Sequence, residues 1–200
     1  SLGKLEREIV PIQMNGLTVD TDGCLRPGTS AEDLAGLKLA FDENGSVTAG
    51  TSSPLTDGAA ATLVCSEAYA QENGLEPIVR IKSIAVSGCK PETMGLGPIF
   101  ASRKALARAE LSADAIDVVE INEAFATQSI ASVRDLGLDI DKVNIDGGAI
   151  AIGHPLGATG ARITGKAAQI LKREGGRYAL STQCIGGGQG IATVMETVGA

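Results

Sequence analysis

Residues 143–176 read VNIDGGAIAIGHPLGATGARITGKAAQILKREGG. The short apolar run at residues 143–146 favours a strand, and the apolar period over residues 158–173 favours a helix that Gly175 and Gly176 end. A glycine-rich loop around His154 joins the two. A strand, a loop and a helix in this order form the repeating unit of α/β domains, so this stretch predicts that fold class.

The same alternation extends outward from this stretch in both directions. We predict strands at residues 78–86, 116–121, 178–183 and 191–196, and helices at residues 99–109 and 123–136. An earlier helix is predicted to begin at Asp57-Gly58 and to end at Asn73-Gly74. Residues 1–35 show no sustained helical period and are interpreted as an irregular segment. We therefore expect a layered α/β fold with helices covering the sheet and with ligand sites at the strand ends.

Composition excludes several classes of function. The net charge is −7 and the seventeen basic residues form no cluster, which argues against a nucleic-acid or anionic-membrane partner. Aromatic residues make up only 2% of the chain, so base stacking is not expected. No apolar run is long enough to span a membrane, and the first residues lack a secretory signal, so we expect a cytoplasmic protein.

The cysteines and the single histidine limit the chemistry further. Four cysteines without a Cys-x-x-Cys pair, together with one histidine, do not form a zinc motif, and we expect no bound metal. Cys24, Cys65 and Cys89 have no acid–base partner nearby in sequence and are interpreted as structural thiols. Lys90 could lower the pKa of Cys89, but nothing else favours that cysteine as a nucleophile.

His154 and Cys184 are the candidate catalytic residues. His154 lies in a glycine- and proline-rich turn before a helix whose free amides could receive an oxyanion, although a lone histidine is more often structural. Cys184 follows a strand and precedes Gly186-Gly187-Gly188, a turn that could aim N–H groups at a carbonyl oxygen. Taken alone, Cys184 reads as a buried inert thiol.

Asn122 ends a predicted strand and Glu123 begins a helix in the run Asn122-Glu123-Ala124-Phe125. An amide at this strand edge could face a ligand, but an ordinary helix cap is the simpler interpretation of this short motif. The glycine runs match neither a P-loop nor a Rossmann fingerprint, so a nucleotide-phosphate cradle is not favoured.

Together and in this order, NEAF at residues 122–125, GHPLG at 153–157 and CIGGGQG at 184–190 resemble the catalytic signatures of the thiolase family, the acetyl-CoA C-acyltransferases. The likeness extends to VTAGTSS at 47–53, DGAAA at 57–61 and MGLGP at 94–98. Thr51, Ser52 and Thr56 depart mildly from the family pattern.

The resemblance implies a thiolase-like layered fold in which this chain corresponds to the second half of the enzyme. Residues 1–35 would be the tail of the loop domain, 36–73 the last strand and helix of the N-terminal domain, and 74–200 the complete βαβαβαββ C-terminal domain. The first half, which would carry the nucleophilic cysteine, is not among these residues. A polypeptide of this sequence is therefore expected to be inactive without a partner half.

The resemblance also implies a role for each candidate residue. His154 would deprotonate the nucleophilic cysteine and help to bind the thioester oxygen, while Asn122 would hold a water beside it. Cys184 would be the second acid–base, with the Gly186 N–H in a second oxyanion site. Ser53 would lie near the CoA pantetheine, and Met94 and Phe125 would line the pocket.

The expected reaction is the reversible thiolysis of 3-ketoacyl-CoA in fatty-acid β-oxidation, with CoA as a substrate and no cofactor. The full-length enzyme would be a homodimer or homotetramer. Two alternatives remain within the family: a biosynthetic acetoacetyl-CoA-forming enzyme, and a non-catalytic half-module that needs a partner chain. Outside the family, a cysteine hydrolase built on Cys184 and His154 would need these two side chains within hydrogen-bond reach.

Overall fold

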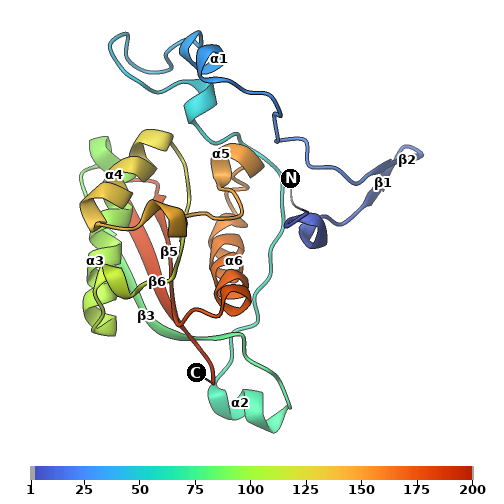
Figure 1. Ribbon diagram of the computed structural model, residues 1–200, viewed down its shortest axis with the longest axis vertical. Helices are drawn as coiled ribbons and strands as arrows, with labels where there is room; N and C mark the ends of the chain where they lie inside the picture. The colour runs from blue at the N-terminus through green and yellow to red at the C-terminus, as the bar shows by residue number, and fades with distance from the viewer. Residues whose placement is uncertain (1–2, 200) are drawn as a thin grey trace.

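A computed structural model describes residues 3–199, and its centre is a four-stranded mixed sheet (Figure 1). The strands are β3 (Val79–Gly88), β4 (Val118–Ile121), β5 (Tyr178–Ile185) and β6 (Gln189–Thr197), in the order β3-β6-β5-β4. β4 and β5 are parallel, whereas β6 is antiparallel to both of its neighbours. All four strands lie where the sequence predicted them, within a few residues at each end.

Helices cover both faces of this sheet, so the body has three layers. On one face lie α3 (Gly97–Ala109) and α4 (Ala126–Leu136), whose apolar residues pack with Val119, Leu180 and Val194 of the sheet. On the other face, α6 (Thr159–Glu174) packs against Val118, Ala179 and Met195. Adjacent sheet residues point to opposite faces, which gives the sheet its two separate apolar cores. The predicted layered α/β fold is confirmed.

The predicted strand at residues 143–146 is wrong, because only Val143 bridges the sheet, beside Val119 of β4. The next residue, Asn144, has a left-handed backbone with φ of 47° that cannot continue a strand. Its side-chain amide bonds both the N–H and the C=O of Ile121 instead, at 2.8 and 2.9 Å. A side chain thus takes the place of a fifth strand at this edge.

The helix predicted to begin at Asp57-Gly58 is also wrong. The chain is extended there, and only α2 (Glu67–Glu72) is helical, ending at Asn73 and Gly74 as the sequence predicted. The residues expected on its apolar face are exposed, Leu63 by 77% and Val64 by 69%. An amphipathic helix depends mostly on burying that face, and within residues 3–199 nothing covers it.

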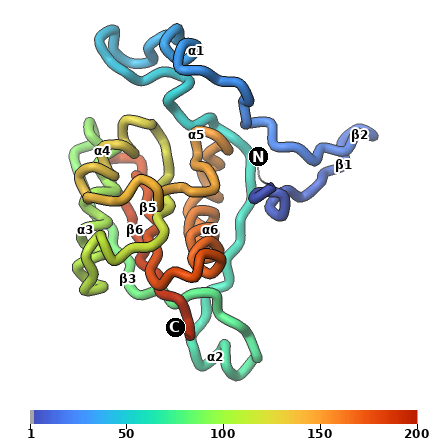
Figure 2. Tube along the Cα trace, in the orientation of Figure 1, coloured from blue at the N-terminus to red at the C-terminus, as the bar shows by residue number. Residues whose placement is uncertain are grey.

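The N-terminal part lies beside the three-layer body and is mostly exposed. It contains η1 (Glu6–Glu8), the hairpin of β1 (Ile12–Met14) and β2 (Leu17–Val19), and α1 (Ala31–Ala35). After η2 (Ala49–Thr51), the extended segment runs past α5 (Ala149–Ile152) and α6 towards α2 (Figure 2). Three further 3-10 helices complete the described elements: η3 (Pro91–Leu96), η4 (Ala113–Ala115) and η5 (Ile140–Lys142).

Among the helices of residues 3–199, none has the length and apolar character needed to cross a membrane.

Candidate active site

Two of the predicted catalytic residues meet in the structure. Asn122 follows the last residue of β4, and His154 lies in the loop between α5 and α6. The amide Nδ2 of Asn122 lies 3.4 Å from Nε2 of His154. Residues 32 positions apart in sequence therefore present an amide and an imidazole to the same place.

The His154 ring has a second polar partner, which the sequence analysis missed. Its Nδ1 lies 2.7 Å from the hydroxyl of Thr159, in the first turn of α6. Burial, and secondly the charge of Arg162, lower the pKa of His154 below its ordinary value. The imidazole is therefore neutral near pH 7 and able to accept a proton.

The loop that carries His154 is fixed by two glycines and a carboxylate. Glu123 accepts hydrogen bonds from the Ile150 N–H at 3.1 Å and from Asn144 Nδ2 at 2.7 Å. A Cβ at Gly148 would lie 2.1 Å from that carboxylate, and one at Gly153, where φ is 92°, would lie 2.5 Å from the Thr56 hydroxyl. The positive φ at Gly153 favours glycine there, and a larger residue at Gly148 would push the Glu123 carboxylate out of its place.

Residues 52–55 connect the loop after Asn122 with the loop that carries His154. The Ser53 N–H donates to Ala124 O at 3.1 Å, and the His154 N–H donates to Pro54 O at 3.2 Å. The Ser53 hydroxyl also lies 3.5 Å from Ala124 O. The expected pantetheine contact of Ser53 stays a prediction; in the structure this serine ties the extended segment to the loop after Asn122.

Cys184 is the last residue but one of β5, opposite Gly190 of β6. Its thiol is partly buried, and this burial raises its pKa, so the thiol is protonated at neutral pH. Beyond it, the position that a Cβ would take at Gly186 has no atom within 4 Å. A side chain at position 186 would therefore meet open space.

No hydrogen bond joins Cys184 to His154 within residues 3–199. This weakens the cysteine-hydrolase alternative, which needs the two side chains in direct contact. In the same range, no group of three or more His, Cys, Asp or Glu side chains could hold a metal ion.

The two expected pocket residues both lie near α4. Phe125 caps its N-terminus and meets the ring of Phe41 edge to face, with the centroids 6.0 Å apart. Met94 lies in η3, which packs against α4 and the ends of β5 and β6. Contact of either residue with a ligand stays a prediction.

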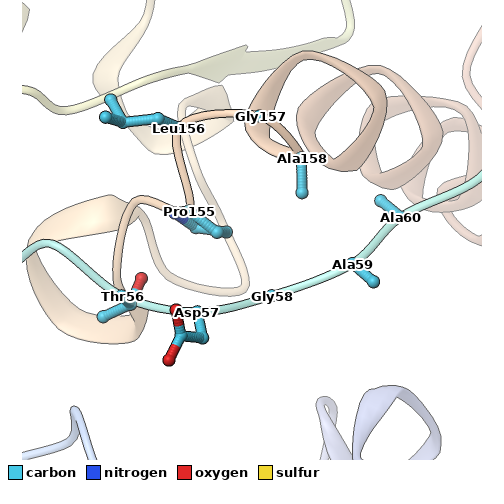
Figure 3. A pocket seen from close by; sticks show the side chains of 9 residues that line it. All are labelled: Thr56, Asp57, Gly58, Ala59, Ala60, Pro155, Leu156, Gly157 and Ala158. Atoms are coloured by element: carbon cyan, nitrogen blue, oxygen red, sulfur yellow. The ribbon is translucent and has the colours of Figure 1, made fainter.

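An open cleft of about 370 Å³ lies beside the His154 loop. Figure 3 shows it between the extended residues 56–60 and the loop 155–158 that leads into α6. Asn122, His154 and Cys184 do not line it. The cleft begins at Pro155, directly after His154.

Two family models match most of this chain. Residues 75–197 match the family described as the thiolase C-terminal domain, and residues 1–68 match the thiolase N-terminal domain. A 3-ketoacyl-CoA thiolase of Alcanivorax borkumensis is 52% identical over 98% of this chain and 52% of its own length.

Solved structures give the same result. An acetyl-CoA acetyltransferase of Bacillus anthracis has a TM-score of 0.92 and 43% identity, over 98% of this chain and 51% of its own. The human mitochondrial 3-ketoacyl-CoA thiolase in complex with CoA has a TM-score of 0.88 and 41% identity, over 98% and 50%. The chain thus spans about half the length of the proteins that it matches.

Proposed function

Because the chain belongs to the thiolase family, we propose that it supplies the acid–base half of an acyltransferase that moves acyl groups between carbon and the sulfur of CoA. The observation that carries this proposal is the meeting of Asn122 with a neutral His154, at 3.4 Å. Its relatives include a 3-ketoacyl-CoA thiolase, and one solved relative is a complex with CoA.

In this proposal His154 acts first as a general base. Its Nε2 removes the proton of a nucleophilic thiol, and the resulting imidazolium donates that N–H to the thioester oxygen. Asn122 assists beside it. Its Oδ1 is buried and has no hydrogen-bond partner within residues 3–199, which fits a water held there.

Cys184 acts as the second acid–base. In thiolysis the bond between C2 and C3 of the 3-ketoacyl-CoA breaks, and the departing acetyl-CoA carbanion takes the Cys184 proton. The acyl group stays on the nucleophilic sulfur until CoA gives its thiol proton to the Cys184 thiolate. The resulting CoA thiolate then takes the acyl group as a shortened acyl-CoA and releases the nucleophilic sulfur. The raised pKa of the Cys184 thiol supports this role, because the acid must be protonated before the bond breaks. We assign the Gly186 N–H to the second oxyanion site.

The nucleophile itself is assigned to a first half that a polypeptide of these 200 residues does not provide. We therefore expect no thiolysis by that polypeptide alone. Leu55, Leu63 and Val64 are exposed along the extended segment beside the cleft, which favours a partner half covering this side.

The test combines two measurements on one purified sample. Intact mass under denaturing conditions identifies the polypeptide, and thiolysis of acetoacetyl-CoA measures its activity. A single species of 20.3 kDa is expected to be inactive and to gain activity when the first half of a relative is added. Activity of the 20.3 kDa species alone would contradict the assignment of the nucleophile.

Two variants separate the proposed roles in the reconstituted enzyme. Cys184→Ala is expected to lose thiolysis but to keep acetyl exchange between acetyl-CoA and a second thiol, because exchange forms no carbanion. His154→Ala is expected to lose both reactions. Equal loss of both reactions in the two variants would contradict this division.

We favour the degradative reaction of β-oxidation, in keeping with the name of the 52% identical relative. The likeness to the acetyl-CoA acetyltransferase structure is the observation that supports the biosynthetic alternative. Comparing kcat/KM for acetoacetyl-CoA and for a long-chain 3-ketoacyl-CoA in the reconstituted enzyme distinguishes them. A marked preference for acetoacetyl-CoA would favour the biosynthetic enzyme.

A further inference from the structure

The two ring nitrogens of His154 face different partners, and this difference indicates which of the two nitrogens carries the proton. Nδ1 lies 2.7 Å from the Thr159 hydroxyl oxygen, and Nε2 lies 3.4 Å from the Asn122 amide nitrogen. The Thr159 oxygen also lies 2.9 Å from the carbonyl oxygen of Pro155. Thr159 is fully buried, so water does not compete for this hydroxyl.

A hydroxyl has one proton to donate, and a carbonyl oxygen can only accept. The Thr159 proton is therefore directed to Pro155 O, and the hydroxyl oxygen accepts the hydrogen bond from His154. It follows that Nδ1 of His154 carries the proton. In the neutral imidazole Nε2 is then unprotonated, which agrees with the Asn122 N–H that faces it.

We propose that Thr159 is a positioning residue that holds His154 in its Nδ1–H tautomer and so keeps Nε2 free to take the proton of the nucleophile. The proposal rests on the function proposed above. Neutral histidine in water prefers the opposite tautomer, with the proton on Nε2, and in that form the nitrogen facing Asn122 is no longer a base. Thr159 would act only through His154, without contact with the substrate.

The tautomer can be measured on the polypeptide without any enzyme activity, because His154 is the only histidine. In a sample labelled with [15N]histidine, the two ring nitrogens give one pair of NMR signals. Protonated and unprotonated nitrogens of a neutral imidazole resonate far apart. Above the titration midpoint we expect a protonated Nδ1 and an unprotonated Nε2. A protonated Nε2 in the folded chain would overturn the inference.

Three variants of α6 test the role of the hydroxyl. Thr159→Val removes it with little change of shape and is expected to shift the tautomer towards Nε2–H. Thr159→Ser keeps the hydroxyl and is expected to retain Nδ1–H. The matched control is Thr164→Val, because the Thr164 hydroxyl faces Ser181 Oγ at 3.1 Å rather than the imidazole. An unchanged tautomer in folded Thr159→Val would overturn the inference; if that variant does not fold, the parent spectrum and Thr159→Ser decide it.

In the reconstituted enzyme, Thr159→Val is expected to lower kcat at least about tenfold, and Thr159→Ser to restore most of it. The NMR spectrum tests the tautomer, and the activity tests the proposed function, so the two can be refuted separately. Nδ1–H without any thiolysis by the reconstituted enzyme would refute the proposed function and leave the tautomer assignment intact. Thiolysis with an Nε2–H tautomer would refute the role of Thr159 and leave the acyltransferase activity intact.

Discussion

Removing the Asn144 side chain tests how the site is held together. This buried amide accepts from the Ile121 N–H at 2.8 Å and donates to Ile121 O at 2.9 Å and to Glu123 Oε1 at 2.7 Å. Ile121 precedes Asn122, and Glu123 holds the loop of His154 through Ile150. One side chain therefore connects the loops of Asn122 and His154 to the sheet edge.

The expected loss of stability follows from these three bonds. Asn144→Gly leaves three polar groups without their hydrogen-bond partner. Each such buried group costs at least about 1 kcal/mol, so the unfolding free energy is expected to fall by about 3 kcal/mol. Asn144→Ala loses the same bonds and must also place a Cβ in the left-handed region, where φ is 47°. That conformation adds about 1 kcal/mol, so alanine is expected to be worse than glycine.

Urea unfolding of the polypeptide, followed by circular dichroism, measures both losses as shifts of the midpoint at constant m-value. Asn15 is the matched control, because it also has a left-handed φ, of 53°, but lies exposed in the β1–β2 turn. Asn15→Gly is expected to change the unfolding free energy by less than about 0.5 kcal/mol. The argument is refuted if Asn144→Gly costs no more than that control.

Three further predictions concern single positions. Gly153→Ala is expected to cost at least about 2 kcal/mol in urea unfolding, because φ is 92° and the new Cβ would lie 2.5 Å from the Thr56 hydroxyl; an unchanged midpoint would contradict this. Burial raises the pKa of Glu120 from 4.5 to about 8, so the folded chain keeps a proton that the unfolded chain releases, and stability falls as pH rises from 4.5 to about 8. Glu120→Gln removes that contribution. Between pH 4.5 and about 8, the unfolding free energy of the variant should therefore rise relative to that of the parent, as urea unfolding at several pH values would show. Hydrogen bonds from Arg173 hold the pKa of Asp146 well below its usual 3.8. Asp146→Asn should therefore be less stable than the parent at neutral pH. On acidification below about pH 4 the variant should lose less further stability than the parent does, as acid unfolding would show.

The sequence predicted the layered body well because each of its elements is locally determined. The apolar periods of α3 and α6 and the runs of β5 and β6 agree with the faces that they bury. It failed at residues 57–66, where an apolar period exists but no described residue buries it. A helical pattern predicts a helix only when its apolar face has a surface to meet.

The meeting of Asn122 with His154 was also predictable, through the likeness of their motifs to the thiolase signatures rather than from either residue alone. Their supporting residues were not. Asn144 reads as the interior of a short strand, and Thr159 as an ordinary residue of a helix N-terminus. The role of each depends on a contact across the fold, from Asn144 to Ile121 and Glu123, and on the position of one hydroxyl between an imidazole and a carbonyl.

In the proposed function, these contacts also restrict how a first half could complete the site. A nucleophilic sulfur must come within about 3–3.5 Å of Nε2 of His154 for proton transfer to assist its attack. The cleft between residues 56–60 and 155–158 opens directly beside that loop, on the side of the sheet that carries α6. A partner bound over α3 and α4 would have the whole sheet between its thiol and the cleft. The first half should therefore dock along the extended segment and the start of α6, where Leu55, Leu63 and Val64 are exposed. Charged substitutions at these three residues should weaken its binding more than charged substitutions on α3.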